Sequence, residues 1–97
     1  MTIEIHTPPN KVPAALITKV KRILVEFHQR NGNVSSVEVS FRESIEGRHN
    51  RVCDVRLAGR DHTVSVSRTA RNFRDAADAA FYALGLMTPE REHKKTL

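Results

Sequence analysis

Apolar and polar residues alternate along four short stretches of the chain. Their apolar members are Ile3 and Ile5; Val37, Val39 and Phe41; Cys53, Val55 and Leu57; and Val64 and Val66. Successive side chains of a strand point to opposite faces of a sheet, so each stretch predicts a strand with one apolar and one polar face. Such strands are typical of a sheet that is covered on one side only.

In two longer stretches the apolar residues recur at helical spacing. They are Leu16, Ile17, Val20, Ile23, Leu24 and Phe27 in the first, and Phe73, Ala76, Ala77, Ala80, Phe81 and Leu84 in the second. Each set forms one stripe of an amphipathic helix. Pro13 suits the first turn of the first helix, and Gly32 marks its end. Asn72 and Asp75 predict a capped start for the second helix, and Gly85 predicts a left-handed residue after it.

The predicted elements follow in the order β-α-β-β-β-α. The first strand, the crossover helix and the second strand form a right-handed unit with parallel pairing, and the next two strands extend the sheet as a meander. Both helices must bury their stripes on the apolar face of the sheet. We therefore expect an α+β fold, a two-layer sandwich with a four-stranded mixed sheet and both helices on one face. Residues 1–87 are expected to form this domain, and residues 88–97 a charged flexible tail.

The balance of charge favours an anionic partner. The chain of 97 residues has 16 Lys and Arg against 11 Asp and Glu, a formal net charge of +5. Nucleic acid is the leading polyanionic candidate, and a soluble domain that is merely basic is the alternative. Tryptophan is absent and aromatic residues make up only 5% of the chain, which argues against a surface that stacks single-stranded bases.

Seven cations form two candidate RNA-binding groups. The first is Lys11, Lys19, Lys21 and Arg22 on the outer face of the first helix, and the second is Arg68, Arg71 and Arg74 at the start of the second helix. Cations at a helix start cost about 0.3–1 kcal/mol each, and a bound phosphate offsets that cost. Alternatively, the first group is only a solvated helix face, and Asp75 and Asp78 partly neutralise the second. Arg48 and Arg51 lie in and after the polar connection between the second and third strands. Contact with RNA is one alternative for them, and a solubilising role is the preferred interpretation.

Five segments of the chain resemble the short ribosome hibernation factors, the family of the hibernation-promoting factor, the ribosome-associated inhibitor and the sigma-54 modulation protein. The segments are T-I-E-I-H at 2–6, V-P-A-A-L-I-T-K-V at 12–20, V-S-S-V-E-V-S-F at 34–41, L-A-G-R-D at 57–61 and N-F-R-D-A-A-D-A-A at 72–80. The family's second helix usually continues as a basic run, whereas this chain breaks at Gly85 and Pro89. The resemblance therefore leaves the RNA-facing basic edge either weakened or moved to the second group of arginines.

The resemblance implies a translation inhibitor that binds ribosomal RNA of the small subunit. Such a factor occupies the channel between head and body and blocks the tRNA and mRNA sites during stress or stationary phase. The dimerising domain of the family's long form has no counterpart in these 97 residues, so ribosome pairing by that route is not expected. Two other functions remain open, a generic module for structured RNA and a regulatory domain that binds protein.

No motif of the chain predicts catalysis. The five histidines lack the spacing of a metal site, and neither a glycine-rich phosphate loop nor a serine elbow is present. We expect no enzyme activity, catalytic residue, metal, cofactor or small-molecule substrate. A single cysteine, Cys53, fits a buried thiol in a reducing cytoplasm, and no apolar run is long enough for a membrane span. The sequence leaves the oligomeric state open.

Overall fold

The computed structural model describes residues 2–30, 32–45, 47 and 50–86. Its elements are β1 (Thr2–His6), α1 (Ala14–Arg30), β2 (Val34–Glu43), β3 (Arg51–Gly59), β4 (Thr63–Ala70) and α2 (Phe73–Ala83). The predicted order of strands and helices is therefore confirmed. The tail expected at 88–97 lies outside the described residues.

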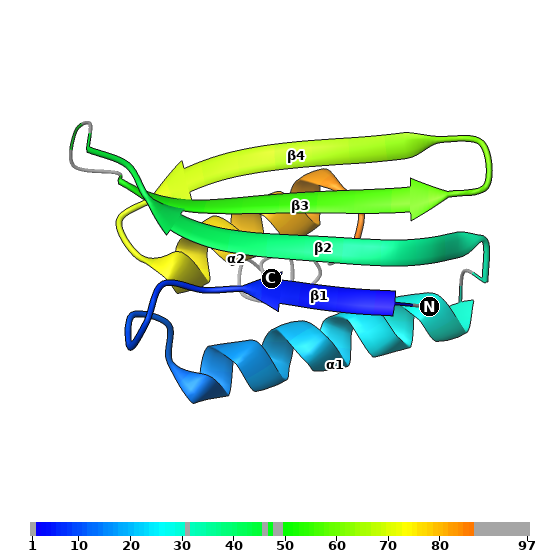
Figure 1. The fold of residues 1–97 in the computed structure, drawn as a ribbon, viewed down its shortest axis with the longest axis horizontal. Coiled ribbons are helices and arrows are strands. Elements are labelled where there is room, and N and C mark those ends of the chain that lie inside the picture. The colour runs from blue at the N-terminus through cyan, green and yellow to red at the C-terminus, as the bar shows by residue number, and fades with distance from the viewer. Residues whose placement is uncertain (1, 31, 46, 48–49, 87–97) are drawn as a thin grey trace, which may run out of the picture.

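The four strands form one mixed sheet in the order β1-β2-β3-β4 (Figure 1). β1 pairs with β2 in parallel, with Ile3 opposite Val37 and Ile5 opposite Val39, and α1 makes the connection between them. β3 and β4 then add antiparallel neighbours. This register places the apolar members of adjacent strands side by side on one face of the sheet.

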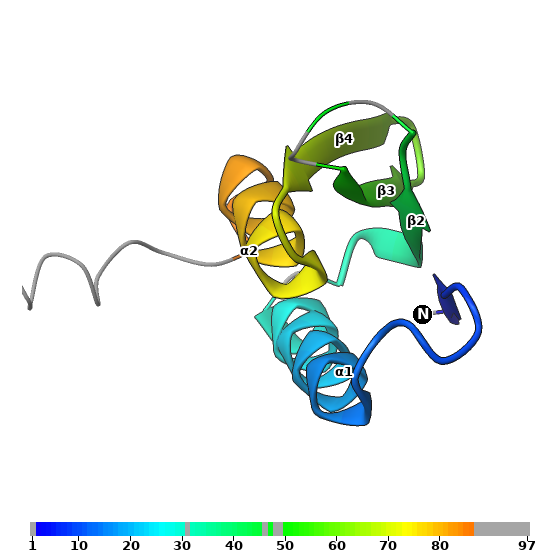
Figure 2. The ribbon, with the colours of Figure 1, turned by 90° about the vertical axis from the view of Figure 1, so that its left-hand side faces the viewer.

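Both helices cover that one face, as Figure 2 shows. The core between the layers consists of Leu16, Val20, Leu24, Val37, Val39, Phe41, Cys53, Val55, Phe73, Ala76, Ala77, Ala80, Phe81 and Leu86. The two aromatic rings of Phe41 and Phe73 meet edge to face, with centroids 5.5 Å apart. The predicted α+β two-layer sandwich is confirmed. In the described part of the chain, neither helix has the length and apolar character that a membrane span requires.

The ends of α2 have the predicted caps. Asn72 has an extended backbone, and its side-chain oxygen accepts a hydrogen bond of 2.8 Å from the backbone N–H of Asp75. After the helix, Gly85 has φ +74°, and the N–H of Leu86 donates to the carbonyl of Phe81 at 2.9 Å. This is a Schellman motif, whose final residue, Leu86, is buried in the core.

Strand β4 is longer than the alternation at 63–67 indicated. It runs to Ala70, which pairs with Arg51, and it includes Arg68, which pairs with Cys53. The prediction that Arg68 belongs to the start of the second helix is therefore wrong. The two-residue alternation in fact continues through Arg68 to the half-buried Ala70, and the helix begins only after the Asn72 cap.

The single cysteine is buried, as the alternation predicted. Cys53 is fully inaccessible, and burial together with the nearby charge of Asp54 raises the pKa of its thiol to about 12. A thiol with so high a pKa is protonated at neutral pH and has little nucleophilic character. Cys53 therefore packs as a small apolar residue of the core.

The uncovered face of the sheet carries paired charges of both signs. Arg42 Nε lies 2.8 Å from a carboxylate oxygen of Asp54. Partial burial opposes ionisation of Asp54, but hydrogen bonds from Arg42 and Ser67, with the Arg42 charge, outweigh it and lower the pKa of the carboxyl. The mixed charges of this face are therefore used in cross-strand pairing.

Candidate nucleic-acid interface

The two helices run in the same direction and begin at the same end of the molecule (Figure 1). Between their first turns lies a groove of about 780 Å³. It is lined by Lys11, Pro13, Ala15, Leu16, Lys19, Arg51, Arg71, Asn72, Phe73, Arg74, Asp75 and Asp78. Figure 2 views the molecule from this end. The groove therefore combines residues from the approach to α1, from β3 and from the start of α2.

The groove has five cations and two carboxylates, and both carboxylates have partners within the protein. Asp78 lies 3.2 Å from Nζ of Lys19, in a pair that joins the two helices and is only about one quarter exposed. Asp75 accepts a hydrogen bond from the Asn72 side chain at 3.2 Å, in addition to the backbone contact of the cap. Among the described residues, neither acid forms an ion pair with Arg71 or Arg74, although the charge of Asp75 has no cationic partner of its own.

Two arginines of the groove are available to a ligand. Arg71 lies in the connection before α2 and Arg74 in its first turn, and both side chains are exposed. Neither has an ion-pair or hydrogen-bond partner among the residues that the structure describes. Free guanidinium groups at the start of a helix suit a phosphate.

Arg51 contributes a cation that the sequence analysis assigned to solubility. Its guanidinium carbon lies 5.7 Å from the ring centre of Phe73, and it also contacts the side chains of Asn50 and Glu43. The alternation that turns Cys53 toward the helices also turns Arg51 toward them, because the two residues are two positions apart on β3. That spacing was the signal that could have identified Arg51.

Three of the seven predicted cations lie outside the groove. Lys21 lines a separate groove of about 400 Å³ between α1 and β1, together with Ile3, Ile5 and Ile17. Arg22 is exposed on α1, and Arg68 lies on β4, where its guanidinium donates to the carbonyl of Ser67 at 2.9 Å. The cations expected together on the first helix are therefore separated, with Lys21 and Arg22 outside the groove.

Four of the predicted cations do meet around the groove. They are Lys11 and Lys19 from the first group and Arg71 and Arg74 from the second. Lys19 was expected on the outer face of its helix, but it points toward α2 and is only 21% exposed. Sequence reasoning separated the two groups because only the packing of α1 beside α2 brings them together.

A second cluster of ionisable groups lies on the uncovered face of the sheet. His6 Nε2 is 3.2 Å from Glu38 and 3.5 Å from Glu4, and the ligand atoms of these three residues lie within 4.8 Å of one another. Spacing along the chain did not reveal this group, because Glu38 comes from the neighbouring strand. All three side chains are about half exposed, and contacts between the imidazole of His6 and the two carboxylates account for their arrangement.

Comparison with known proteins shows a shared fold. No protein-family model and no curated protein matches the sequence. A ribosomal subunit interface protein from Coxiella burnetii is similar with a TM-score of 0.71 and 13% identity, over 87% of this chain and 89% of that one. The N-terminal domain of Protein Y from Thermus thermophilus gives a TM-score of 0.67 and 16% identity, over 87% and 91%. These structures confirm the fold that the family resemblance implied.

Proposed function

We propose that this protein binds the small ribosomal subunit through its RNA and inhibits translation by occupying the tRNA and mRNA sites. The proposal is carried by the groove between the helix starts, where Arg71 and Arg74 have no partner among the described residues. It is supported by the fold, which is shared with a protein described as a ribosomal subunit interface protein. The family resemblance of the sequence adds the expectation of a cytoplasmic factor of resting or stressed cells.

The chemistry of the groove is suited to the RNA backbone. Arginine side chains form paired hydrogen bonds with phosphate oxygens, and the groove provides three arginines and two lysines. The deep major groove of an RNA helix hides its base edges, so a rigid cationic surface recognises the shape and phosphates of folded RNA. Binding of this kind blocks a site by occupancy and needs no cofactor or chemical step.

Reversal of the two free arginines tests the proposal. The protein is mixed with purified bacterial small subunits and sedimented through a sucrose gradient, and the fraction that travels with the subunits is measured. Arg71→Glu with Arg74→Glu is expected to abolish co-sedimentation without loss of the circular dichroism of the fold. The matched control, Arg22→Glu with Arg68→Glu, changes the net charge equally and is expected to remain bound.

The same gradients separate the other candidate functions. Binding to free structured RNA, with no binding to small subunits, would replace the ribosomal proposal by a generic RNA-binding module. Absence from every RNA fraction would indicate a regulatory domain that binds protein. If the groove variant and the control variant co-sediment with small subunits to the same extent, the groove is not the interface.

A further inference from the structure

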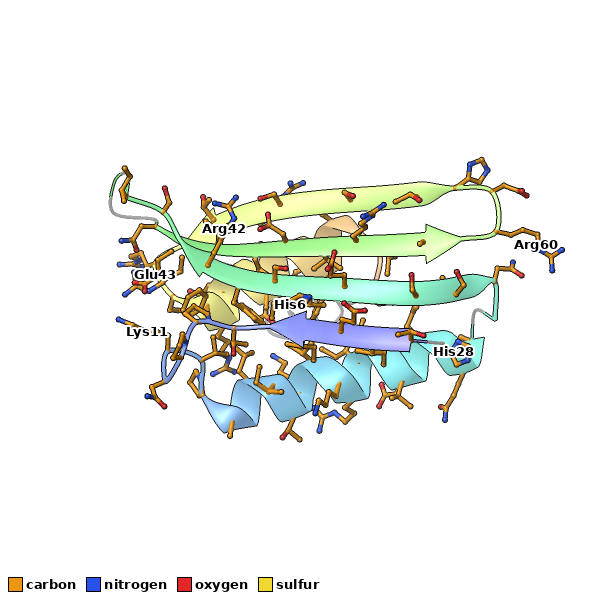
Figure 3. The ribbon with its side chains drawn as sticks, viewed as in Figure 1. His6, Lys11, His28, Arg42, Glu43 and Arg60 are labelled. Atoms are coloured by element: carbon orange, nitrogen blue, oxygen red, sulfur yellow. The ribbon has the colours of Figure 1, made fainter. Side chains whose placement is uncertain are left out.

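Glu43 places a negative charge between two of the groove's cations. It is the last residue of β2, and its two carboxylate oxygens have different partners. One oxygen lies 3.1 Å from a guanidinium nitrogen of Arg51, and the other lies 3.6 Å from Nζ of Lys11. Lys11 and Glu43 both appear at the end of the molecule where β1 and β2 finish (Figure 3). A single carboxylate thus bridges the connection before α1 and the start of β3.

Each of the two residues also has a contact that does not involve Glu43. Arg51 also contacts the ring of Phe73 and the side chain of Asn50. Lys11 lies in the turn before α1, where its backbone N–H donates to the carbonyl of Pro8 at 3.3 Å. A phosphodiester resembles a carboxylate in carrying one negative charge on two exposed oxygens, so it suits the same pair of cations.

We propose that Lys11 and Arg51 form a phosphate subsite of the groove, and that Glu43 occupies it until a backbone phosphate of the bound RNA displaces the carboxylate. The identity of the ligand as RNA rests on the proposed function. The Glu43 side chain is one third exposed and lies at the end of its strand, so it can rotate away from the two cations into solvent. Binding at this subsite exchanges one anion for another, which weakens RNA binding and reduces its dependence on salt.

Affinity for small subunits tests the exchange. Glu43→Gln removes the resident charge and keeps the shape of the side chain, so it is expected to tighten binding about 3- to 10-fold, the size of one to two exposed ion pairs. Its matched control is Glu26→Gln, an equal change of net charge at an exposed position of α1 that has no ion-pair partner among the described residues. The control is expected to change affinity less than twofold.

A double-mutant cycle separates exchange from a general charge effect. Removal of Arg51 by Arg51→Gln destroys the subsite, so Glu43→Gln is expected to gain little in that background. Lys11→Gln, a substitution in an exposed connection, provides the same test should the Arg51 variant lose its fold. A full gain in either background, or an equal gain from Glu26→Gln, would refute the exchange while leaving the proposed function intact.

Titration with inorganic phosphate tests the subsite without ribosomes. Backbone amide signals near Lys11 and Arg51 are followed by NMR in the unaltered protein, in Glu43→Gln and in Glu26→Gln. The Glu43 variant is expected to shift at several-fold lower phosphate concentration than the other two proteins. Identical titrations in all three would overturn the subsite, whereas the expected result together with no binding to small subunits would overturn the proposed function alone.

Discussion

If the proposed RNA binding is correct, Arg71 and Arg74 are expected to determine a measurable part of its salt dependence. Each cation that contacts a duplex phosphate contributes about 0.9 to the slope of log affinity against log salt. Lys19 pairs with Asp78, and Lys11 and Arg51 share Glu43, so these two arginines are the groove cations without an ion-pair partner among the described residues. Replacing both by glutamine should therefore lower the slope by about 1.8.

The assay is the affinity for small subunits measured at several salt concentrations. Between about 50 mM and about 200 mM salt, the unaltered protein should lose about 12-fold more affinity than Arg71→Gln with Arg74→Gln. The reference variant is Arg22→Gln with Arg68→Gln, which removes the same formal charge from α1 and β4, outside the groove. The reference should keep the slope of the unaltered protein.

Two results would refute this reasoning. Equal slopes for the unaltered protein and the groove variant would mean that Arg71 and Arg74 do not contact phosphate. A slope that falls equally in both double variants would mean that net charge alone determines binding, and the pairing of the other groove cations would then have no bearing on the interface.

Three further expectations concern stability. Leu24→Ala should lower the free energy of unfolding in urea by about 2–5 kcal/mol, because Leu24 is completely buried. Asn72→Ala should cost about 1 kcal/mol, because the backbone N–H of Asp75 loses its capping partner. Asp54→Asn should cost at most about 1 kcal/mol at neutral pH, since the pair with Arg42 is exposed. The pKa of Asp54 is lowered by folding, so this last difference should shrink as pH falls below the ordinary value of 3.8.

Each stability measurement has a matched comparison. Val25→Ala on α1 truncates a side chain that is 47% exposed and should cost far less than Leu24→Ala. Asn72→Ser retains a capping oxygen and should recover most of the stability that Asn72→Ala loses. Asp61→Asn, in the exposed turn before β4, should show no comparable loss at neutral pH. A pH-independent effect of Asp54→Asn would contradict the role assigned to its charge.

The sequence predicts most of the fold because local physics determines its elements. The caps at Asn72 and Gly85, the two helix stripes and the parallel first pair of strands were all predictable from spacing and residue type. The error at Arg68 arose because a single arginine on the apolar side of an edge strand resembles the start of a charged helix. Pairing with β3 is what makes Arg68 part of a strand. Its partner, Cys53, lies 15 residues away in the sequence, so local pattern does not reveal the pairing.

The groove was less predictable because it depends on contacts between distant segments. Lys19 pairs with Asp78 across 59 residues of sequence, and no periodicity within α1 indicates which of its cations faces α2. Net charge indicates the class of partner, but only the structure shows which cations are paired with carboxylates and which are not. For this reason the contacts of Glu43 with Arg51 and Lys11 are visible only in the structure.

The direction of the strands has an electrostatic consequence of its own. β1 and β4 point the same way, because two antiparallel pairings and one parallel pairing relate them, and each is followed by a helix that turns back. Both helices thus present their positive dipole ends, about half an elementary charge each, at one pole of the molecule. Any chain with this topology has a positive potential at this pole even without a lysine or arginine there. An anion-binding surface can therefore evolve on this scaffold from a favourable starting field.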